Sequence, residues 1–149
     1  MLLVAGIGPV ATWIVAGLDV RFGWSPQTPW LLSTVGLVVA LIGQRLTVVA
    51  MRENRFFSAI VRIQRDRGHR VVDSGPYARV RHPGYTGAII FALALPVMLG
   101  TMWAFVPSVI TSLLLAVRTA LEDGTLQREL EGYREYADRV RFRLVPGIW

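Results

Sequence analysis

The 149-residue sequence contains no cysteine and no lysine, and only 17% of its residues are charged. Without cysteine, the chain can form no disulfide bond, thiolate metal site or cysteine nucleophile. The two histidines, His69 and His82, are a poor ligand set by themselves, so no metal site is predicted. All sixteen basic residues are arginine, which is typical of a bacterial source of high GC content.

Hydrophobic residues make up 53% of the chain, and the charges are concentrated between long apolar blocks. This distribution is typical of a membrane protein. The first block has no basic n-region and no clear cleavage pattern, so it is interpreted as a retained span. The net charge of +6 comes from basic flanks, which usually set membrane orientation, and nucleic-acid binding is not expected.

The apolar blocks predict transmembrane helices at about 2–18, 30–51, 84–100 and 102–121. No charge occurs from Thr86 to Val117, a run too long for one pass of about twenty residues. Two tight helices with a turn at Gly100-Thr101 are therefore expected, with Trp103 as an interfacial anchor. The sequence thus predicts one all-α integral membrane domain, residues 1–149, with about four spans in two hairpins.

Arginines cluster on one predicted side of the membrane. Eight lie between Arg52 and Arg81 and five follow Leu121, whereas the predicted outer turns contain only Arg21. By the positive-inside rule, both basic segments and both termini are cytoplasmic, and a bacterial inner membrane is the predicted location. Arg45 interrupts the second span, so it should face protein or reach toward the interface, by snorkelling or in a ligand role.

The tail from Glu122 to about Arg143 is predicted to be an amphipathic helix. Its apolar residues recur at spacings of three and four, namely Leu126, Leu130, Tyr133, Ala137 and Val140. Such a cytoplasmic helix could lie on the bilayer or close over a site formed by the basic loop.

Two clusters of residues suit chemistry. The first, from Gly68 to Tyr85, holds both histidines and has Ser-Gly-Pro and His-Pro-Gly turns that expose backbone N–H groups, although an interfacial loop would look the same. In the second, Arg118 and Glu122 share one helix face. They form either an exposed ion pair or a division of labour, in which Arg118 holds an anion and Glu122 accepts hydrogen bonds from hydroxyls.

An ordered set of motifs occupies the second half of the chain. It consists of Gly75-Pro-Tyr-Ala-Arg-Val-Arg-His-Pro-Gly-Tyr85, an apolar hairpin, Arg118-x-x-x-Glu122-Asp123-x-x-Leu126, Gly132-Tyr133-x-x-Tyr136 and Arg143-Leu-Val-Pro146. In this combination the chain from Asn54 to Trp149 resembles the isoprenylcysteine carboxyl methyltransferase family, which is related to membrane phospholipid methyltransferases. That family commonly has two adjacent glutamates at the position of Glu122-Asp123, so Asp123 keeps the charge but shortens the reach.

The resemblance implies that segments at about 64–85 and 118–146 hold S-adenosylmethionine and release S-adenosylhomocysteine on the cytosolic side. By matching position, Arg118 would face the methyl acceptor. The residues that would line the cofactor are Gln64, His69, Arg70, Val71, Val72, Tyr77, His82, Pro83, Gly84, Tyr85 and Glu122.

Acid–base chemistry distinguishes a carboxylate acceptor from an amine acceptor. A carboxylate is ionised at pH 7 and needs no base, whereas an amine needs one, such as His82 or Glu122. Arg118 favours a carboxylate or other anionic acceptor over an amine. Together with the resemblance, this predicts methyl transfer to an amphiphilic, isoprenylcysteine-like or lipidated acceptor from the bilayer. The alternatives are a phospholipid amine N-methyltransferase and a non-catalytic membrane interaction protein. The sequence determines neither the acceptor nor the oligomeric state.

Overall fold

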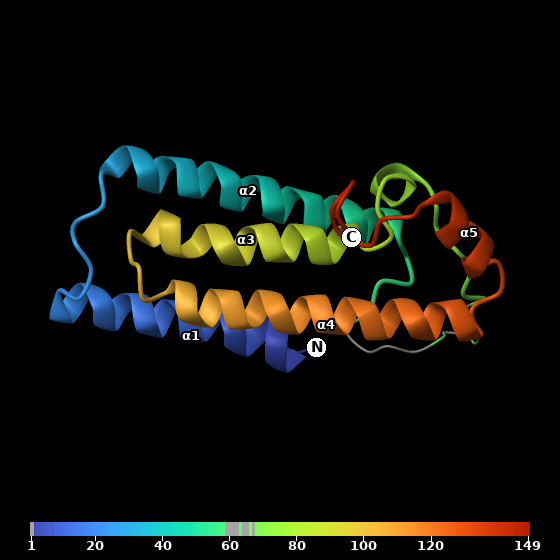
Figure 1. Cartoon of the computed structure of the whole chain (residues 1–149), viewed down its shortest axis with the longest axis horizontal. Coiled ribbons are helices and arrows are strands. Elements are labelled where there is room, and N and C mark those ends of the chain that lie inside the picture. Colours follow the sequence, from blue (N-terminus) through green and yellow to red (C-terminus); the bar gives the residue numbers. More distant parts are fainter. Residues whose placement is uncertain (1, 59–62, 64–65, 67) are drawn as a thin grey trace.

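The computed structural model describes residues 2–58, 63, 66 and 68–149, and the regular structure in this part of the chain is helical. Its long helices are α1 (Leu2–Phe22), α2 (Trp30–Glu53), α3 (Pro83–Leu99) and α4 (Phe105–Glu129). A short 3-10 turn, η2 (Gly75–Ala78), and helix α5 (Tyr133–Arg139) lie beyond one end of this bundle (Figure 1).

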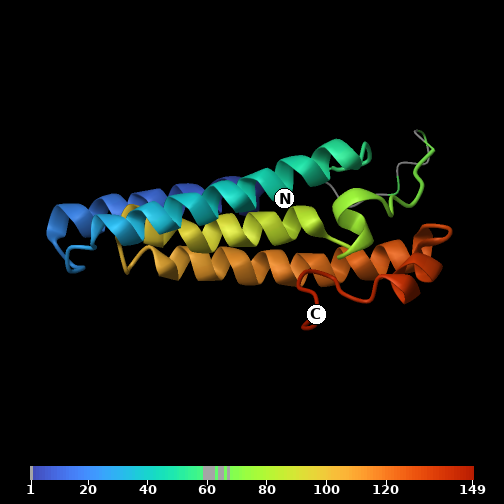
Figure 2. The same ribbon diagram turned by 90° about the horizontal axis from the view of Figure 1, so that it is seen from above.

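The long helices run side by side, with α3 between α2 and α4 and with α1 against α4 (Figures 1 and 2). The α1–α2 and α3–α4 connections share one end of the bundle, here called the turn end. The opposite end, here called the pocket end, carries η2, α5 and the C-terminal segment (Figure 1). Helices α2 and α3 lie within two residues of the predicted bounds, whereas α1 ends four residues later and α4 starts three residues and ends eight residues later than predicted. Helices α2 and α4 are long and apolar enough to cross a membrane.

Glycines bring the backbones of α2 and α3 into direct contact. A Cβ added to Gly43 would lie 2.7 Å from the carbonyl oxygen of Gly87, and one added to Gly87 would lie 2.5 Å from that of Gly43. One turn nearer the pocket end, Thr47 Oγ1 donates to the carbonyl oxygen of Gly84 at 3.3 Å. Small residues permit this close packing in membranes, and here they fix the first turn of α3 against α2.

The outward faces of the bundle are apolar. On α4 they include Leu113, Leu114 and Val117, which are 61%, 48% and 59% exposed. Arg45 is also exposed, on the outer side of α2. This exposure argues against the predicted placement in which Arg45 faces protein, and its reach toward the interface stays a prediction.

At the turn end, Gly100 adopts φ 69° and ends α3, which confirms the predicted turn. The buried Asp19 ties this turn to the α1–α2 connection, because its carboxylate accepts hydrogen bonds from the Ser25 amide at 2.7 Å and the Ser25 hydroxyl at 2.6 Å. The Trp103 amide donates to the same carboxylate at 3.4 Å. The two turns are therefore held together by one buried acid.

The predicted single helix from Glu122 to Arg143 is wrong. Helix α4 continues to Glu129, the chain then breaks, and α5 starts after Gly132, which has φ 77°. The break lets Leu130, Tyr133 and Tyr136 form one buried cluster, against which Ile63, Val71, Leu126, Ala137 and Val140 pack. The apolar positions were identified correctly, but they pack against the loop preceding α3, as in the second of the two predicted placements.

Candidate cofactor and acceptor site

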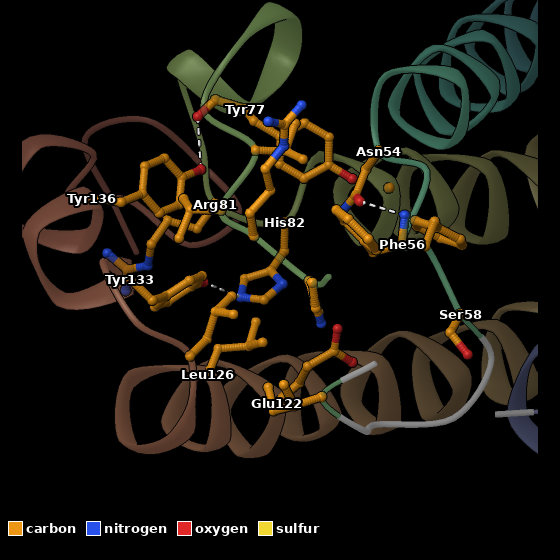
Figure 3. Close-up of a pocket in the computed structure, with 18 of the residues that line it drawn as sticks. Asn54, Phe56, Ser58, Tyr77, Arg81, His82, Glu122, Leu126, Tyr133 and Tyr136 are labelled. Atoms are coloured by element: carbon orange, nitrogen blue, oxygen red, sulfur yellow. Dashed lines mark hydrogen bonds between the residues drawn. The ribbon is translucent and has the colours of Figure 1, made fainter. Parts of the chain in front are cut away.

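A pocket opens at the pocket end between the end of α2, the segment leading into α3, the last turns of α4, and α5 (Figure 3). Its lining residues are Asn54, Phe56, Phe57, Ser58, Ile63, His69, Arg70, Val71, Val72, Tyr77, Arg81, His82, Gly84, Tyr85, Glu122, Thr125, Leu126, Leu130, Tyr133 and Tyr136. These residues come from both halves of the chain, so the pocket exists only in the folded protein.

Nine of the eleven residues predicted to bind the cofactor line this pocket, namely His69, Arg70, Val71, Val72, Tyr77, His82, Gly84, Tyr85 and Glu122. Pro83 does not line it, because it is the buried first residue of α3. Gln64 lies outside the described residues. Arg118 is not a lining residue either, but it contacts one that is.

Asp123 is fully buried next to the pocket and accepts hydrogen bonds from two arginines. Arg81 Nε and Nη2 donate at 2.7 and 3.1 Å, and Arg143 Nε donates at 2.9 Å. The remaining nitrogen of Arg81, Nη1, donates to the carbonyl oxygens of Val140 and Arg141 at 2.8 and 2.9 Å. A buried carboxylate is stable only when it is paired, and this pairing ties α4, the entry to α3 and the tail together.

The same carboxylate fixes the ring of His82. His82 Nε2 lies 3.4 Å from the Tyr133 hydroxyl (Figure 3). It also lies 3.2 Å from Asp123 Oδ1, and the Tyr133 hydroxyl donates to the same oxygen at 3.0 Å. Burial and the charge of Asp123 raise the pKa of Tyr133 well above its usual value, so the phenol stays protonated and donates. This nitrogen of His82 is therefore engaged within the protein.

A phenol connects the pocket to Arg118. Tyr85 Oη donates to Glu122 Oε2 at 2.7 Å and accepts from Arg118 Nε at 2.8 Å, while Arg118 and Glu122 are 3.9 Å apart. Tyr85 and Glu122 line the pocket, and Arg118 lies on α4 one turn deeper in the bundle. The predicted ion pair is thus arranged around Tyr85, a bridging role that the sequence pattern did not indicate.

Aromatic side chains also line the pocket. The rings of Phe56 and His69 lie 4.6 Å apart with an interplanar angle of 30°. Burial lowers the pKa of His69, although the charge of Glu122 opposes this, so the imidazole is neutral near pH 7. The Tyr77 hydroxyl donates to the Ala50 carbonyl at 3.3 Å, and burial raises its pKa to about 12. These aromatic rings and Glu122 therefore line the same pocket.

The sequence prediction did not assign Asp123, Arg81, Arg143 or Tyr133 to the site. Asp123 was treated as a variation on its neighbour Glu122, because adjacent acids look equivalent in a sequence. Successive residues of a helix point about 100° apart, so Glu122 reaches the pocket while Asp123 turns inward. The direction in which each residue points on the helix is the signal in the sequence that could have distinguished the roles of Glu122 and Asp123.

The chain is similar to known proteins over much of its length. The family model described as "Isoprenylcysteine carboxyl methyltransferase (ICMT) family" matches residues 34–128. The human protein-S-isoprenylcysteine O-methyltransferase is 30% identical over 144 residues, which cover 90% of this chain and 48% of the relative. The B form of Arabidopsis thaliana is 32% identical over 114 residues, 74% of this chain and 58% of the relative, and the Schizosaccharomyces pombe enzyme is 40% identical over 113 residues, 72% and 47%.

Among solved structures, the eukaryotic intramembrane Ras methyltransferase ICMT matches with a TM-score of 0.78 at 23% identity, covering 95% of this chain and 52% of that one. At this identity the match shows the fold, which is that of an intramembrane protein. The chain spans between 37% and 58% of the length of the curated relatives described above and of two rice relatives named as probable enzymes of the same type. The extent of the family match and the identity to these relatives show that the chain belongs to the isoprenylcysteine carboxyl methyltransferase family.

Proposed function

We propose that this protein transfers a methyl group from S-adenosylmethionine to the carboxylate of an amphiphilic, isoprenylcysteine-like acceptor that approaches from the bilayer. The observation that carries the proposal is the Tyr85 bridge. It joins Glu122, in the pocket, to Arg118, on α4, through hydrogen bonds of 2.7 and 2.8 Å. The bridge places the polar pocket, suited to a soluble cofactor, next to a cation that is suited to an anionic, lipid-like acceptor. Methyl transfer requires the two reactants to be held close together in this way.

The residues of the pocket fit the proposed cofactor. When bound, S-adenosylmethionine supplies a methyl group on an activated sulfonium. Phe56 and His69 offer an aromatic pair suited to the adenine, and Glu122 offers a carboxylate suited to the ribose hydroxyls. Arg81 also lines the pocket, but its guanidinium is already committed to Asp123 and to backbone carbonyls.

The state of the histidine supports a carboxylate acceptor over an amine. An amine must lose a proton before it attacks, which requires a base, whereas a carboxylate is already ionised at pH 7. His82 Nε2 is engaged by Asp123 and Tyr133, and Glu122 is engaged by Tyr85. Arg118 can orient an anionic acceptor by a charge-assisted hydrogen bond. The rate acceleration would then come from positioning the reactants and excluding water.

The proposal places four spans in the membrane, with the pocket end and both termini on the cytoplasmic side. The excess of arginine around the pocket supports this orientation. The relatives compared above are eukaryotic, so the bacterial inner membrane stays a prediction from the arginine-only composition.

Labelled methyl transfer tests the reaction. Detergent-purified protein is incubated with methyl-labelled S-adenosylmethionine and two competing acceptors, an N-acetylated S-prenyl cysteine and an amine phospholipid, and the product is then treated with base. Base-labile label is expected, because a methyl ester hydrolyses. Base-stable label would instead indicate N-methylation and overturn the carboxylate assignment.

A calorimetric titration with S-adenosylhomocysteine tests the cofactor separately. Saturable binding is expected for the unmodified protein, and His82→Ala should lose it because this ring lies in the pocket wall. Absence of binding in folded, unmodified protein would favour the non-catalytic alternative.

A further inference from the structure

The tail beyond α5 turns back along the bundle. The His82 amide donates to the carbonyl oxygen of Arg143, and Thr86 Oγ1 donates to that of Leu144, both at 2.9 Å. Arg143 thus bonds to His82, the residue before α3, and the next residue, Leu144, bonds to Thr86 in the first turn of α3. The tail therefore runs toward the middle of the bundle along α3 and not outward from the pocket end.

The depth of the tail follows from its buried residue. Leu144 packs in one buried cluster with Tyr85 and Leu115. Leu115 precedes Arg118 by three residues on α4, which places it about 4.5 Å farther from the pocket end at about 1.5 Å per residue. Leu144 thus packs beside Leu115, next to the part of α4 that exposes apolar residues such as Leu114.

Residues 144–149 form a compact turn, here called the C-terminal hook. The carbonyl oxygen of Trp149 accepts hydrogen bonds from the amides of Leu144 and Val145 at 2.8 and 3.0 Å, and the Ile148 and Trp149 amides donate to the Val145 carbonyl at 3.1 Å. Gly147 reverses the chain with φ +81°. Many of its backbone groups are thus satisfied internally, which is the condition for entering a bilayer.

The hook presents apolar side chains outward. Ile148 is 80% exposed and Val145 42% exposed. The Trp149 ring, 36% exposed, lies against the Arg143 guanidinium, 5.1 Å from ring centroid to Cζ. Apolar side chains beside Trp and Arg are the composition that membrane interfaces favour.

Charge near the hook suits lipid headgroups. Among the described residues, Arg139 pairs with Asp73 and Arg143 with Asp123, whereas the exposed side chain of Arg141 makes no ion pair. This arginine, three residues before the hook, is placed to meet a phosphate at the membrane surface.

We propose that the C-terminal hook inserts into the bilayer leaflet on the pocket side, with Ile148 among the acyl chains and Arg141 at the headgroups. The hook continues the lipid-facing surface of α4 and anchors the tail whose Arg143 pairs with Asp123 at the pocket. This inference rests on the membrane placement proposed above but not on methyltransferase activity.

The absence of cysteine makes a direct test possible, because an introduced thiol is the single one in the chain. Ile148→Cys is spin-labelled in lipid nanodiscs, and its accessibility to oxygen and to a water-soluble nickel complex is measured. Leu113→Cys, on the exposed apolar face of α4, calibrates lipid, and Glu131→Cys, exposed at the pocket end, calibrates water. The Ile148 label is expected to favour oxygen as the Leu113 label does.

A Ile148 label as accessible to nickel as the Glu131 label would overturn the inference. If the Leu113 label were also in water, the membrane placement itself would be wrong and the hook proposal with it, an outcome distinct from failure at Ile148 alone. Val145→Cys gives a second reading of the same hook if Ile148→Cys does not fold.

Discussion

Each end of the bundle contains a buried aspartate, and the two are satisfied in different ways. At the turn end, Asp19 is 1% exposed and accepts hydrogen bonds from neutral donors, the amide and hydroxyl of Ser25 and the amide of Trp103. At the pocket end, Asp123 is 0% exposed and pairs with two arginines, Arg81 and Arg143.

The difference in partners reflects a difference in role: Asp19 holds two turns together, whereas Asp123 organises side chains that line the pocket. The donors to Asp19 belong to two turns, and none of them lines the pocket. Of the groups around Asp123, Arg81, His82 and Tyr133 all line the pocket, so a disturbance of this carboxylate reaches any bound ligand. Neutral donors offset less of the cost of burying a carboxylate than arginines do. When the carboxylate is removed, however, neutral donors leave no unpaired cation in the protein, whereas arginines do.

The largest effect is expected for Asp123→Asn. It leaves Arg81 and Arg143 without a counter-charge, and breaking a buried ion pair in this way costs about 3–5 kcal/mol. Thermal unfolding in detergent should show a strong loss of stability, and calorimetry should show loss of S-adenosylhomocysteine binding. Asp123→Glu, which keeps the charge, should lose less of both. Unchanged binding in Asp123→Asn would show that this carboxylate does not organise the pocket.

A smaller effect is expected at the other end. In Asp19→Asn, the amide oxygen can still accept from the Ser25 amide and the Ser25 hydroxyl can reorient, so the cost should be about 1 kcal/mol, the scale of one hydrogen bond. Affinity for S-adenosylhomocysteine should stay within twofold of the unmodified protein. A loss of affinity like that of Asp123→Asn would erase the distinction between the two ends.

Within the pocket end, Glu122 and Arg118 should separate binding from turnover. Glu122→Ala removes a pocket carboxylate and should weaken S-adenosylhomocysteine binding about tenfold, or about 1.4 kcal/mol. Arg118→Ala should bind within threefold of normal but transfer methyl groups at least tenfold more slowly to the prenyl cysteine. Calorimetry and labelled transfer measure the two effects. Normal binding by both variants would show that Glu122 has no cofactor role.

The smallest effect concerns pH. Burial lowers the pKa of His69 in the folded protein, so protonation of this ring favours the unfolded chain. The stability tied to the neutral ring is present above the unfolded pKa of about 6.5 and decreases as the pH falls below it. The melting temperature of His69→Gln should therefore fall less between pH 8 and pH 5.5 than that of the unmodified protein. Equal falls would mean that His69 is not desolvated.

The helices were predictable because their signal is local. An uncharged run from Thr86 to Val117 exceeds the length of one span, and Gly100 is the glycine near its middle, where a left-handed turn divides the run into two helices. Nine of the twenty residues that line the pocket were predictable for another reason, since the motif from Gly75 to Tyr85 occurs in order with the later motifs of the family.

The break between α4 and α5 was not predictable from periodicity. Leu130, Tyr133 and Ala137 fit one continuous helix equally well, and the decision came from packing against Val71, more than fifty residues earlier. Gly132 allows the break because it can adopt a positive φ, but it does not require one.

The sequence by itself determined an all-helical membrane chain and two of the segments that line the pocket, because apolar length and ordered motifs are properties of the chain alone, whereas it did not indicate the lining residues within 54–58. The tertiary structure decided which of two adjacent acids faces inward, that Tyr85 bridges Glu122 and Arg118, and that the tail turns back along α3. These outcomes depend on helical phase and on hydrogen bonds between residues far apart in sequence, and only folding brings such partners together.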